Sequence, residues 1–346
     1  LLAHLQSSDS IPLGVDFAML KEVSDLTRTE QRMVFIQLSN TEDTTYNLPF
    51  LVKFPDDIDL LANTQRIVDM LPILHTRFVN GKAVEDVEVS VQDLSRADPS
   101  EIKRFLYSPF DMSVGPLCRF GVNNKTNNLY LNIHHSIADG RPFQILFEAI
   151  VNGKTKTSTR NWSIRKYAAF EALPEVIAEQ QASVNKYAEM LEDTPPRLDL
   201  DFAIPSVYHA SSIILDNGAR SALEEHCRKE KISLFALALG VMKEAVRAYS
   251  HEAFAIGTAY DSRPARFRDC IGMFVNTVLI PFGKGKEGGN ETLTQLNDRW
   301  RNSILPLALT PYDMVSAVGY GCNLCLAFNV GIIDVNERAH RKSALE

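Results

Sequence analysis

Residues 129–140 read LYLNIHHSIADG, an apolar run that ends in two adjacent histidines and, four residues later, in an Asp-Gly pair. The alternation of side chains predicts a strand over residues 129–135, and the apolar stripe of residues 143–150 predicts a helix directly after it. A histidine at the end of a strand stands on a rigid element and can still reach a cavity, as a general base must. The alternative is that two polar residues simply close a strand before a turn, and the spacing alone leaves both interpretations open.

The predicted strand has an antiparallel partner. Residues 117–122 form a second apolar run, and the intervening NNKTNN of residues 123–128 is typical of a hairpin turn. Successive side chains of a strand point to opposite faces, so His134 and His135 cannot share one role if the strand continues that far. One of the two histidines is then structural, and Asp139 could be no more than the N-cap of the following helix.

Length and composition bound the class of protein. A chain of 346 residues exceeds what one hydrophobic core usually spans, which favours two domains. The net charge of −7 argues against a general nucleic-acid binder, because such a protein needs a concentrated positive surface. No apolar run approaches the roughly 18 residues of a membrane span. Because the chain begins at Leu1 without an initiator methionine, we expect it to be a piece of a longer protein.

Five cysteines are too few for a disulfide framework in a chain of this length, which favours a reduced, cytoplasmic protein. Cys322 and Cys325 form a CxxC, but no second pair or nearby histidine in the sequence completes a zinc site. The surrounding run is apolar and strand-like, so we predict buried thiols there rather than a metal or redox site.

Strands and helices alternate in both halves of the chain, which predicts an α/β or α+β fold with sheets backed by helices. Prolines at positions 195, 196 and 205 flank a segment that we expect to connect two domains of comparable size.

Residues 134–140 fit the motif HHxxxDG, and six further stretches fit other motifs of one family in the family's order. These stretches are residues 27–35 (with Gln31), 46–49 (YNLP), 74–78 (LHTRF), 110–117 (FDMSVGPL), 256–263 (IGTAYDSR) and 271–277 (IGMFVNT). Over residues 25–335 the chain therefore resembles the condensation domains of nonribosomal peptide synthetases. These domains belong to the acyltransferase superfamily with the chloramphenicol-acetyltransferase-like fold.

The resemblance implies two acetyltransferase-like subdomains in a V-shaped pseudo-dimer, with the active site at their interface. Residues 1–175 would form the N-terminal subdomain that carries HHxxxDG, and residues 176–346 the C-terminal one. The activity implied is amide or ester bond formation between a carrier-bound acyl or peptidyl thioester and a carrier-bound amine or other nucleophile.

The resemblance also implies roles for the site residues. His135 would line the reaction centre, either as the general base that takes the amine proton or as a group that orients the amine or the tetrahedral intermediate. His134 is expected to be structural. Asp139 is interpreted as a bracing carboxylate whose partner is Arg263, a residue of the other half of the chain; the alternative for Arg263 is a solvated loop arginine.

Two further positions complete the expected site. Gly140 would let a backbone approach the thioester closely, and its alternative role is that of a turn glycine. Asn276 is expected to tie a crossover loop rather than to bind substrate. The chain itself should need no cofactor and no metal, because 4′-phosphopantetheine arrives on donor and acceptor carrier domains, next to which an adenylation domain is expected.

The chain departs from the family pattern at several places. Pro72 and His75 replace the histidine and arginine that lead the second motif, and because that arginine helps to brace the motif aspartate, the departure weakens the expected bracing. Arg141-Pro142 stands where epimerising relatives show Ser-Trp, which disfavours epimerisation. The chain is short near residues 151–161 and 319–320, through missing or natively short loops. Two other functions stay open: a stand-alone acyltransferase that uses CoA or a carrier and an alcohol, and a non-catalytic docking relative.

Overall fold

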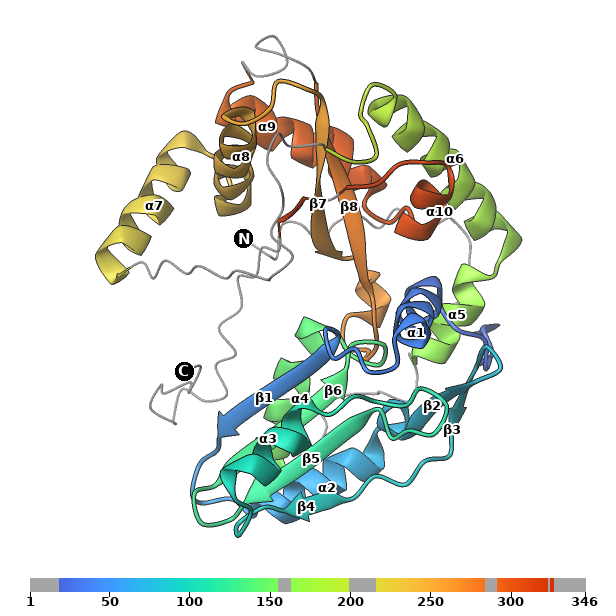
Figure 1. Cartoon of the computed structure of the whole chain (residues 1–346), viewed down its shortest axis with the longest axis vertical. Helices are drawn as coiled ribbons and strands as arrows, with labels where there is room; N and C mark the ends of the chain where they lie inside the picture. The colour runs from blue at the N-terminus through green and yellow to red at the C-terminus, as the bar shows by residue number, and fades with distance from the viewer. Residues whose placement is uncertain (1–18, 155–162, 199–215, 284–290, 323, 327–346) are drawn as a thin grey trace. The chain divides into compact units, whose positions relative to one another are not determined.

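The computed structural model describes residues 19–154, 163–198, 216–283, 291–322 and 324–326. The chain folds into two compact units (Figure 1). Unit 1 contains Leu1–Ile177 and Arg263–Val275, and unit 2 contains Ala178–Ser262 and Asn276–Val330. The sequence-based division placed residues 263–275 in the C-terminal subdomain, whereas the structure groups them with unit 1.

A four-stranded mixed sheet of order β1-β6-β5-β4 organises unit 1. Its strands are β1 (Asn47–Lys53), β4 (Val91–Asp93), β5 (Cys118–Asn123) and β6 (Asn128–His134). β6 pairs antiparallel with both β1 and β5, and β4 pairs in parallel with β5. The predicted hairpin is confirmed, but β6 ends at His134, so His135 lies just beyond the strand.

A short hairpin follows a 3₁₀ turn (η3, Pro72–His75) in unit 1. Its strands are β2 (Thr76–Val79) and β3 (Lys82–Glu85). Asn80 and Gly81 join them with φ angles of 51° and 72°. Two successive positive φ angles are the requirement of a type I′ turn, which explains the Asn-Gly sequence.

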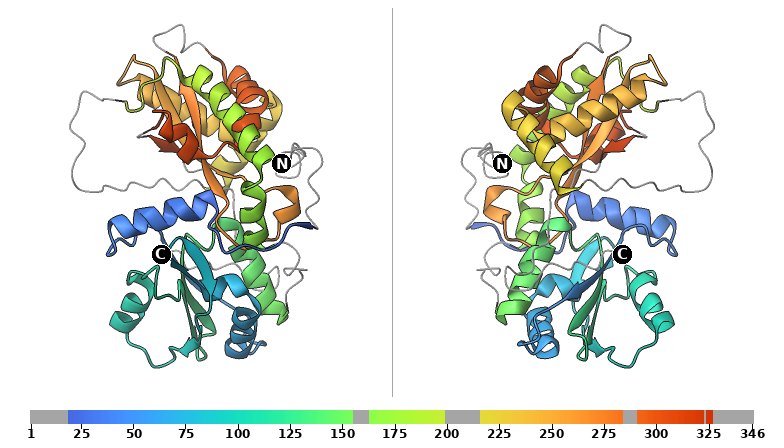
Figure 2. Two further views of the ribbon diagram at one scale, coloured as in Figure 1. Left: turned by 90° about the vertical axis from the view of Figure 1, so that its right-hand side faces the viewer. Right: turned by 90° about the vertical axis from the view of Figure 1, so that its left-hand side faces the viewer.

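Unit 1 also contains five α-helices among its described residues. They are α1 (Arg28–Ser39), α2 (Leu60–Met70), α3 (Pro99–Tyr107), α4 (Gly140–Asn152) and α5 (Ile164–Glu171). Leu131 and Ile133 of β6 lie in the main core, which also contains buried residues of α2 and α4, whereas Tyr130 clusters with Leu106 of α3. Figure 2 shows α3 on one side of the sheet and α2 on the other. Because side chains alternate along a strand, one strand contributes to both layers.

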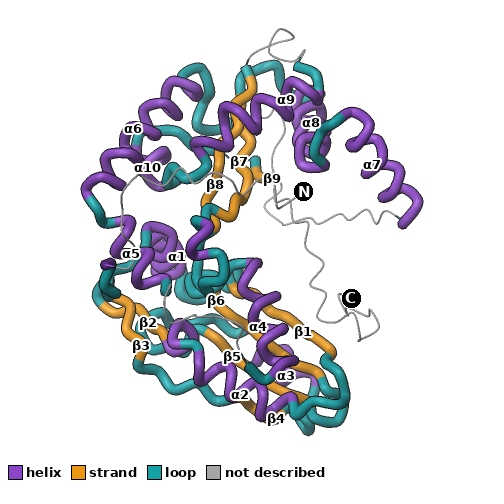
Figure 3. Tube along the Cα trace, turned by 180° about the vertical axis from the view of Figure 1, so that it is seen from behind, coloured by secondary structure: helices purple, strands orange, loops and turns teal. Residues whose placement is uncertain are grey.

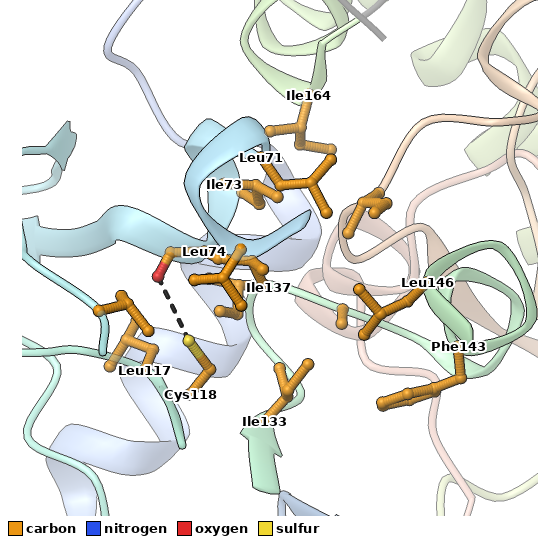
Figure 4. Packing of buried hydrophobic residues seen from close by; sticks show 14 of the residues in the cluster. Leu71, Ile73, Leu74, Leu117, Cys118, Ile133, Ile137, Phe143, Leu146 and Ile164 are labelled. Atoms are coloured by element: carbon orange, nitrogen blue, oxygen red, sulfur yellow. Dashed lines mark hydrogen bonds between the residues drawn. The ribbon is translucent and has the colours of Figure 1, made fainter. Parts of the chain in front are cut away.

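The predicted helix over residues 143–150 is confirmed within α4. Phe143 and Phe147 pack on Phe50 of β1 with ring centroids 4.2 and 6.3 Å apart. Figure 4 shows apolar side chains of β6, α4 and the η3 turn converging at this core. The Cys118 thiol donates there to the Leu74 carbonyl oxygen at 3.3 Å.

Residues 263–275, called the return segment, belong to unit 1 because they pack on α5. Phe267 and Phe274 are buried, and their rings lie 5.3 and 4.8 Å from that of Tyr167. A Cβ atom on Gly272 would stand 2.8 Å from Cδ1 of Ile164, so glycine permits this close approach. The segment is therefore an integral part of the core of unit 1.

Unit 2 contains a three-stranded sheet of order β8-β7-β9 and five α-helices among its described residues (Figure 3). The strands are β7 (Phe254–Asp261), β8 (Val275–Phe282) and β9 (Cys325–Leu326). The helices are α6 (Pro174–Leu191), α7 (Asn217–Glu230), α8 (Leu234–Arg247), α9 (Leu293–Arg299) and α10 (Tyr312–Ala317). The hydroxyl of Tyr187 in α6 accepts from the Leu279 N–H at 2.9 Å and lies 2.8 Å from the Leu279 carbonyl oxygen, which ties that helix to the buried β8.

The prediction of buried thiols in the CxxC is wrong for Cys325, which is exposed, and only partly right for Cys322, which is half-buried. β9 is one of the two outer strands of the described sheet, so one side of it has no described neighbouring strand to cover it. An apolar sequence run does not distinguish an edge strand from a central one.

Candidate active site

His134 is held by a network that fixes which ring nitrogen carries hydrogen. The Gln37 amide nitrogen donates to three backbone carbonyl oxygens, so its Oε1 atom is the acceptor that faces His134 Nε2 at 3.1 Å. His134 Nε2 must therefore carry the hydrogen. Its Nδ1 atom accepts from the Ser136 N–H at 3.2 Å and lies 2.8 Å from the Ser136 hydroxyl. Burial lowers the pKa of His134 to about 4, so the ring is neutral near pH 7.

His135 has the opposite tautomer. It follows β6, is half-buried, and donates its backbone N–H to the Tyr46 carbonyl oxygen at 2.8 Å. Its Nδ1 atom lies 3.1 Å from the thioether sulfur of Met273. A thioether has no hydrogen to give, so Nδ1–H must donate in this contact. Nε2 then carries the lone pair, as a general base requires.

The electrostatic surroundings of His135 favour its neutral form. Burial lowers the pKa of His135, and the positive charge of Arg32 acts in the same direction. Hydrogen bonding to backbone carbonyls of His135 and Ala138, together with the negative charge of Asp139, opposes that shift. The net direction is downward, so near pH 7 the ring is mostly unprotonated and able to accept a proton.

Asp139 is joined to the return segment by three hydrogen bonds. Arg263 Nη2 lies 2.9 Å from both carboxylate oxygens, and the Phe274 N–H donates to Oδ2 at 3.0 Å. The guanidinium of Arg263 also lies over the Phe274 ring, 4.4 Å from its centroid. Both charged side chains are 1% exposed. Asp139 occupies the N-cap position of α4 without a side-chain capping bond, so its carboxylate serves the ion pair instead.

His75 does not take over the bracing of Asp139. Its Nδ1 and Nε2 atoms lie 2.8 and 3.0 Å from the carbonyl oxygens of Val87 and Val68. The ring therefore ties the end of α2 to the strand region beyond β3. The bracing comes from the return segment, so the departure at position 75 leaves it intact.

The two remaining predicted residues, Gly140 and Asn276, lie in different units. A Cβ atom on Gly140 in unit 1 would meet no described atom within 4 Å, so this position leaves open space. In unit 2, the Asn276 amide donates to the Ala308 and Thr310 carbonyl oxygens at 3.0 and 2.7 Å and accepts from the Tyr312 N–H at 3.0 Å. The Asn276 side chain thus bonds three backbone groups and holds the loop before α10.

Sequence analysis did not single out Gln37 or Met273, and it missed a buried ion pair. Glu30 is fully buried, and its Oε1 atom pairs with Arg165 Nη2 of α5. Burial raises the pKa of Glu30, while the Arg165 charge and the Thr27 hydrogen bonds act against that shift. The sequence feature that could have drawn attention to Glu30 is the capping box Thr27-x-x-Glu30, which starts α1. Next to it, the Thr29 hydroxyl donates to the Met273 carbonyl oxygen at 2.6 Å.

Within the described ranges, no group of three or more His, Cys, Asp or Glu side chains is placed to hold a metal ion. In that same part of the chain, no helix combines the length and the apolar character needed to cross a membrane.

A family model and two relatives of similar sequence give consistent results. The family model described as "Condensation domain" matches residues 21–305. Surfactin synthase subunit 1 of Bacillus subtilis (strain 168) is 26% identical over 318 residues, covering 84% of this chain and 9% of its own. Cyclosporin synthetase simA of Tolypocladium inflatum is 25% identical over 301 residues, covering 76% of this chain and 2% of its own. The chain thus spans a small fraction of the length of these relatives.

Solved structures show the same fold at low sequence identity. The starter condensation domain of rhizomide synthetase RzmA, a mutant in complex with C8-CoA and Leu-SNAC, superposes with a TM-score of 0.68 at 13% identity. It covers 88% of this chain and 77% of its own. The first condensation domain of the calcium-dependent antibiotic synthetase, in complex with substrate analogue 2a, gives a TM-score of 0.68 at 16% identity. The coverage there is 90% of this chain and 81% of the other.

Proposed function

The chain belongs to the condensation domain family, and we propose that it joins two carrier-bound substrates by forming an amide or ester bond. The donor is an acyl or peptidyl thioester on one carrier, and the acceptor is an amine or another nucleophile on a second carrier. The observation that carries this proposal is the state of His135: a neutral ring whose Nδ1–H is directed to Met273 Sδ, with the lone pair left on Nε2.

In the proposed reaction the acceptor amine attacks the thioester carbonyl and loses a proton as the C–N bond forms. An α-amine has a pKa of about 8, so it needs little activation, but the leaving proton needs an acceptor. His135 Nε2 is suited to take it, and the same proton can return to the departing thiolate of the donor arm. The competing role for His135 is to orient the amine or to hydrogen-bond the tetrahedral intermediate.

The neighbouring residues would position His135 rather than react. The His134 network and the ion pair of Asp139 with Arg263 hold the turn that carries it. The open space at Gly140 suits the close passage of a thioester. We propose donor and acceptor carrier domains as the partners, each presenting 4′-phosphopantetheine, with an adenylation domain as a neighbour. Relatives of the chain are named as a synthetase or as synthases, among them cyclosporin synthetase and gramicidin S synthase 2, which supports this assignment.

The test uses loaded donor and acceptor carriers, with the condensed product measured by mass spectrometry. We expect His135→Ala to lose most of the activity, about 10²- to 10⁴-fold on the usual scale of general base catalysis. His226→Ala, which removes an exposed histidine of α7, is the matched control and should leave the rate unchanged. A wild-type rate in His135→Ala would refute the site.

Two other outcomes identify other functions. Product from CoA thioesters and free alcohols, with none from any carrier pair, would assign a stand-alone acyltransferase. No product with any substrate, together with binding of a carrier, would assign a docking relative. The intact geometry of His135 and Asp139 argues against the latter.

A further inference from the structure

The CxxC of unit 2 brings two thiols together at one point of the sheet. β9 pairs in parallel with β7, with Gly257 opposite Cys325, and the Gly257 N–H donates to the Leu324 carbonyl oxygen at 2.8 Å. A Cβ atom on Gly257 would lie 2.5 Å from the Cys322 sulfur and 3.3 Å from the Cys325 sulfur. Both sulfurs therefore occupy the space that a side chain at position 257 would fill, and they are neighbours.

We propose that Cys322 and Cys325 form a dithiol that reacts with small-molecule disulfides and closes to an internal disulfide. The exposed Cys325 is the attacking thiol, and the half-buried Cys322 is the resolving thiol. This site is separate from the histidine motif and does not depend on the proposed condensation activity.

The two thiols have different protonation states, which fits this division of labour. A hydrogen bond from the Cys322 thiol lowers the pKa of Cys325 to about 6, against a smaller opposing effect of burial. The same hydrogen bond, followed by burial, raises the pKa of Cys322. Near pH 7 Cys325 is thus mostly thiolate, the form that attacks disulfides, while Cys322 keeps its proton.

The chemistry balances with oxidised glutathione as the oxidant. The Cys325 thiolate attacks one glutathione sulfur, the glutathione disulfide bond breaks, and one glutathione thiolate leaves with a mixed disulfide formed on the protein. This removes the anion that held the proton on Cys322. Cys322 then loses its proton to solvent, attacks the Cys325 sulfur and expels the second glutathione thiolate. The protein dithiol is oxidised to a disulfide while one glutathione disulfide is reduced to two thiols.

The remaining cysteines provide internal controls. Cys118, Cys227 and Cys270 are buried, and burial raises the pKa of each thiol. Buried, protonated thiols attack disulfides slowly, so the reaction should be confined to the CxxC. Cys227 of α7 belongs to the same unit and is the closest match for a control variant.

The experiment treats the reduced chain with oxidised glutathione and follows intact and peptide masses over time. We expect the wild type to lose two hydrogens through a transient adduct, Cys322→Ser to accumulate a stable glutathione adduct on Cys325, and Cys325→Ser to react at least tenfold more slowly. Cys227→Ser should behave as the wild type. The rate at which the wild type first forms its glutathione adduct should reach its plateau at lower pH than that of an ordinary cysteine, whose pKa is about 8.5.

Three results would overturn the proposal. One is equal labelling of Cys325 and Cys227. A second is a stable adduct on wild-type Cys325 that Cys322 never resolves. The third is the absence of a disulfide between residues 322 and 325 in peptide mapping of the oxidised wild type. This measurement needs no serine variant, so it holds even if such a variant fails to fold.

Discussion

Removing one partner of the ion pair between Asp139 and Arg263 should lower the free energy of unfolding of unit 1 by more than the loss of an exposed ion pair would. Both side chains are 1% exposed, and the carboxylate receives three hydrogen bonds at 2.9–3.0 Å. Asp139→Ala removes the carboxylate that pairs with the buried Arg263 guanidinium and accepts from the Phe274 N–H. Arg263→Ala leaves a buried carboxylate with one donor. Breaking a buried pair from one side costs about 3–5 kcal/mol, a large part of the 5–15 kcal/mol that stabilises a typical domain.

The double variant separates the pair energy from the loss of packing. Replacing both residues by alanine removes both charges, so neither is left uncompensated in the core. We therefore expect the double variant to cost less than the sum of the single variants, by about 1–3 kcal/mol. Urea unfolding followed by far-UV circular dichroism gives the three free energies. Hydrogen exchange of peptides covering residues 128–140 locates the change in unit 1.

An exposed ion pair of the same unit provides the matched control. Arg77 and Asp86 are joined by two hydrogen bonds of 2.7 and 2.8 Å, but their side chains are 32% and 48% exposed. Asp86→Ala should therefore cost no more than about 1 kcal/mol. Single-variant costs that add strictly, or an Asp139→Ala variant as stable as Asp86→Ala, would refute the reasoning that the buried pair is a coupled unit.

Met273→Leu keeps the side-chain volume but removes the sulfur that accepts from His135. The loss of a weak hydrogen bond costs about 0.5–1 kcal/mol, so kcat should fall about two- to fivefold while KM stays unchanged. Met273→Gln supplies another acceptor and should recover the rate; equal losses in both variants would mean a packing effect. His134 binds protons more weakly when folded, at a pKa of about 4 against the ordinary 6.5, so its contribution to stability is complete above pH 6.5 and declines as the pH falls toward 4. Urea unfolding should show the wild type losing about 2 kcal/mol more than His134→Gln between about pH 8 and pH 5, and equal losses would contradict this.

Local patterns predicted the elements that carry the site. The hairpin of β5 and β6, the start of α4 and the position of the histidine pair follow from alternation, turn residues and apolar spacing within some thirty residues. The link between Asp139 and Arg263 came only from the resemblance to a family. Its partners are 124 positions apart, and no periodicity of one sequence records such a contact.

The partners of the two histidines were beyond sequence analysis for the same reason. Gln37 lies 97 positions from His134, and Met273 lies 138 positions from His135. His75 shows a different limit. A residue that replaces an arginine was expected to weaken the bracing of Asp139, yet it bonds two carbonyl oxygens nearby, while the bracing comes from the return segment.

The two histidines show why the motif cannot be interpreted from its own letters. They are adjacent and chemically identical, yet one donates from Nε2 and the other from Nδ1. An amide on α1 whose nitrogen is already engaged dictates the first choice, and a thioether on the return segment dictates the second. The return segment also supplies both donors to Asp139. HHxxxDG therefore forms a defined chemical arrangement only together with residues 263–275, so that segment is as much a part of the candidate site as the motif itself.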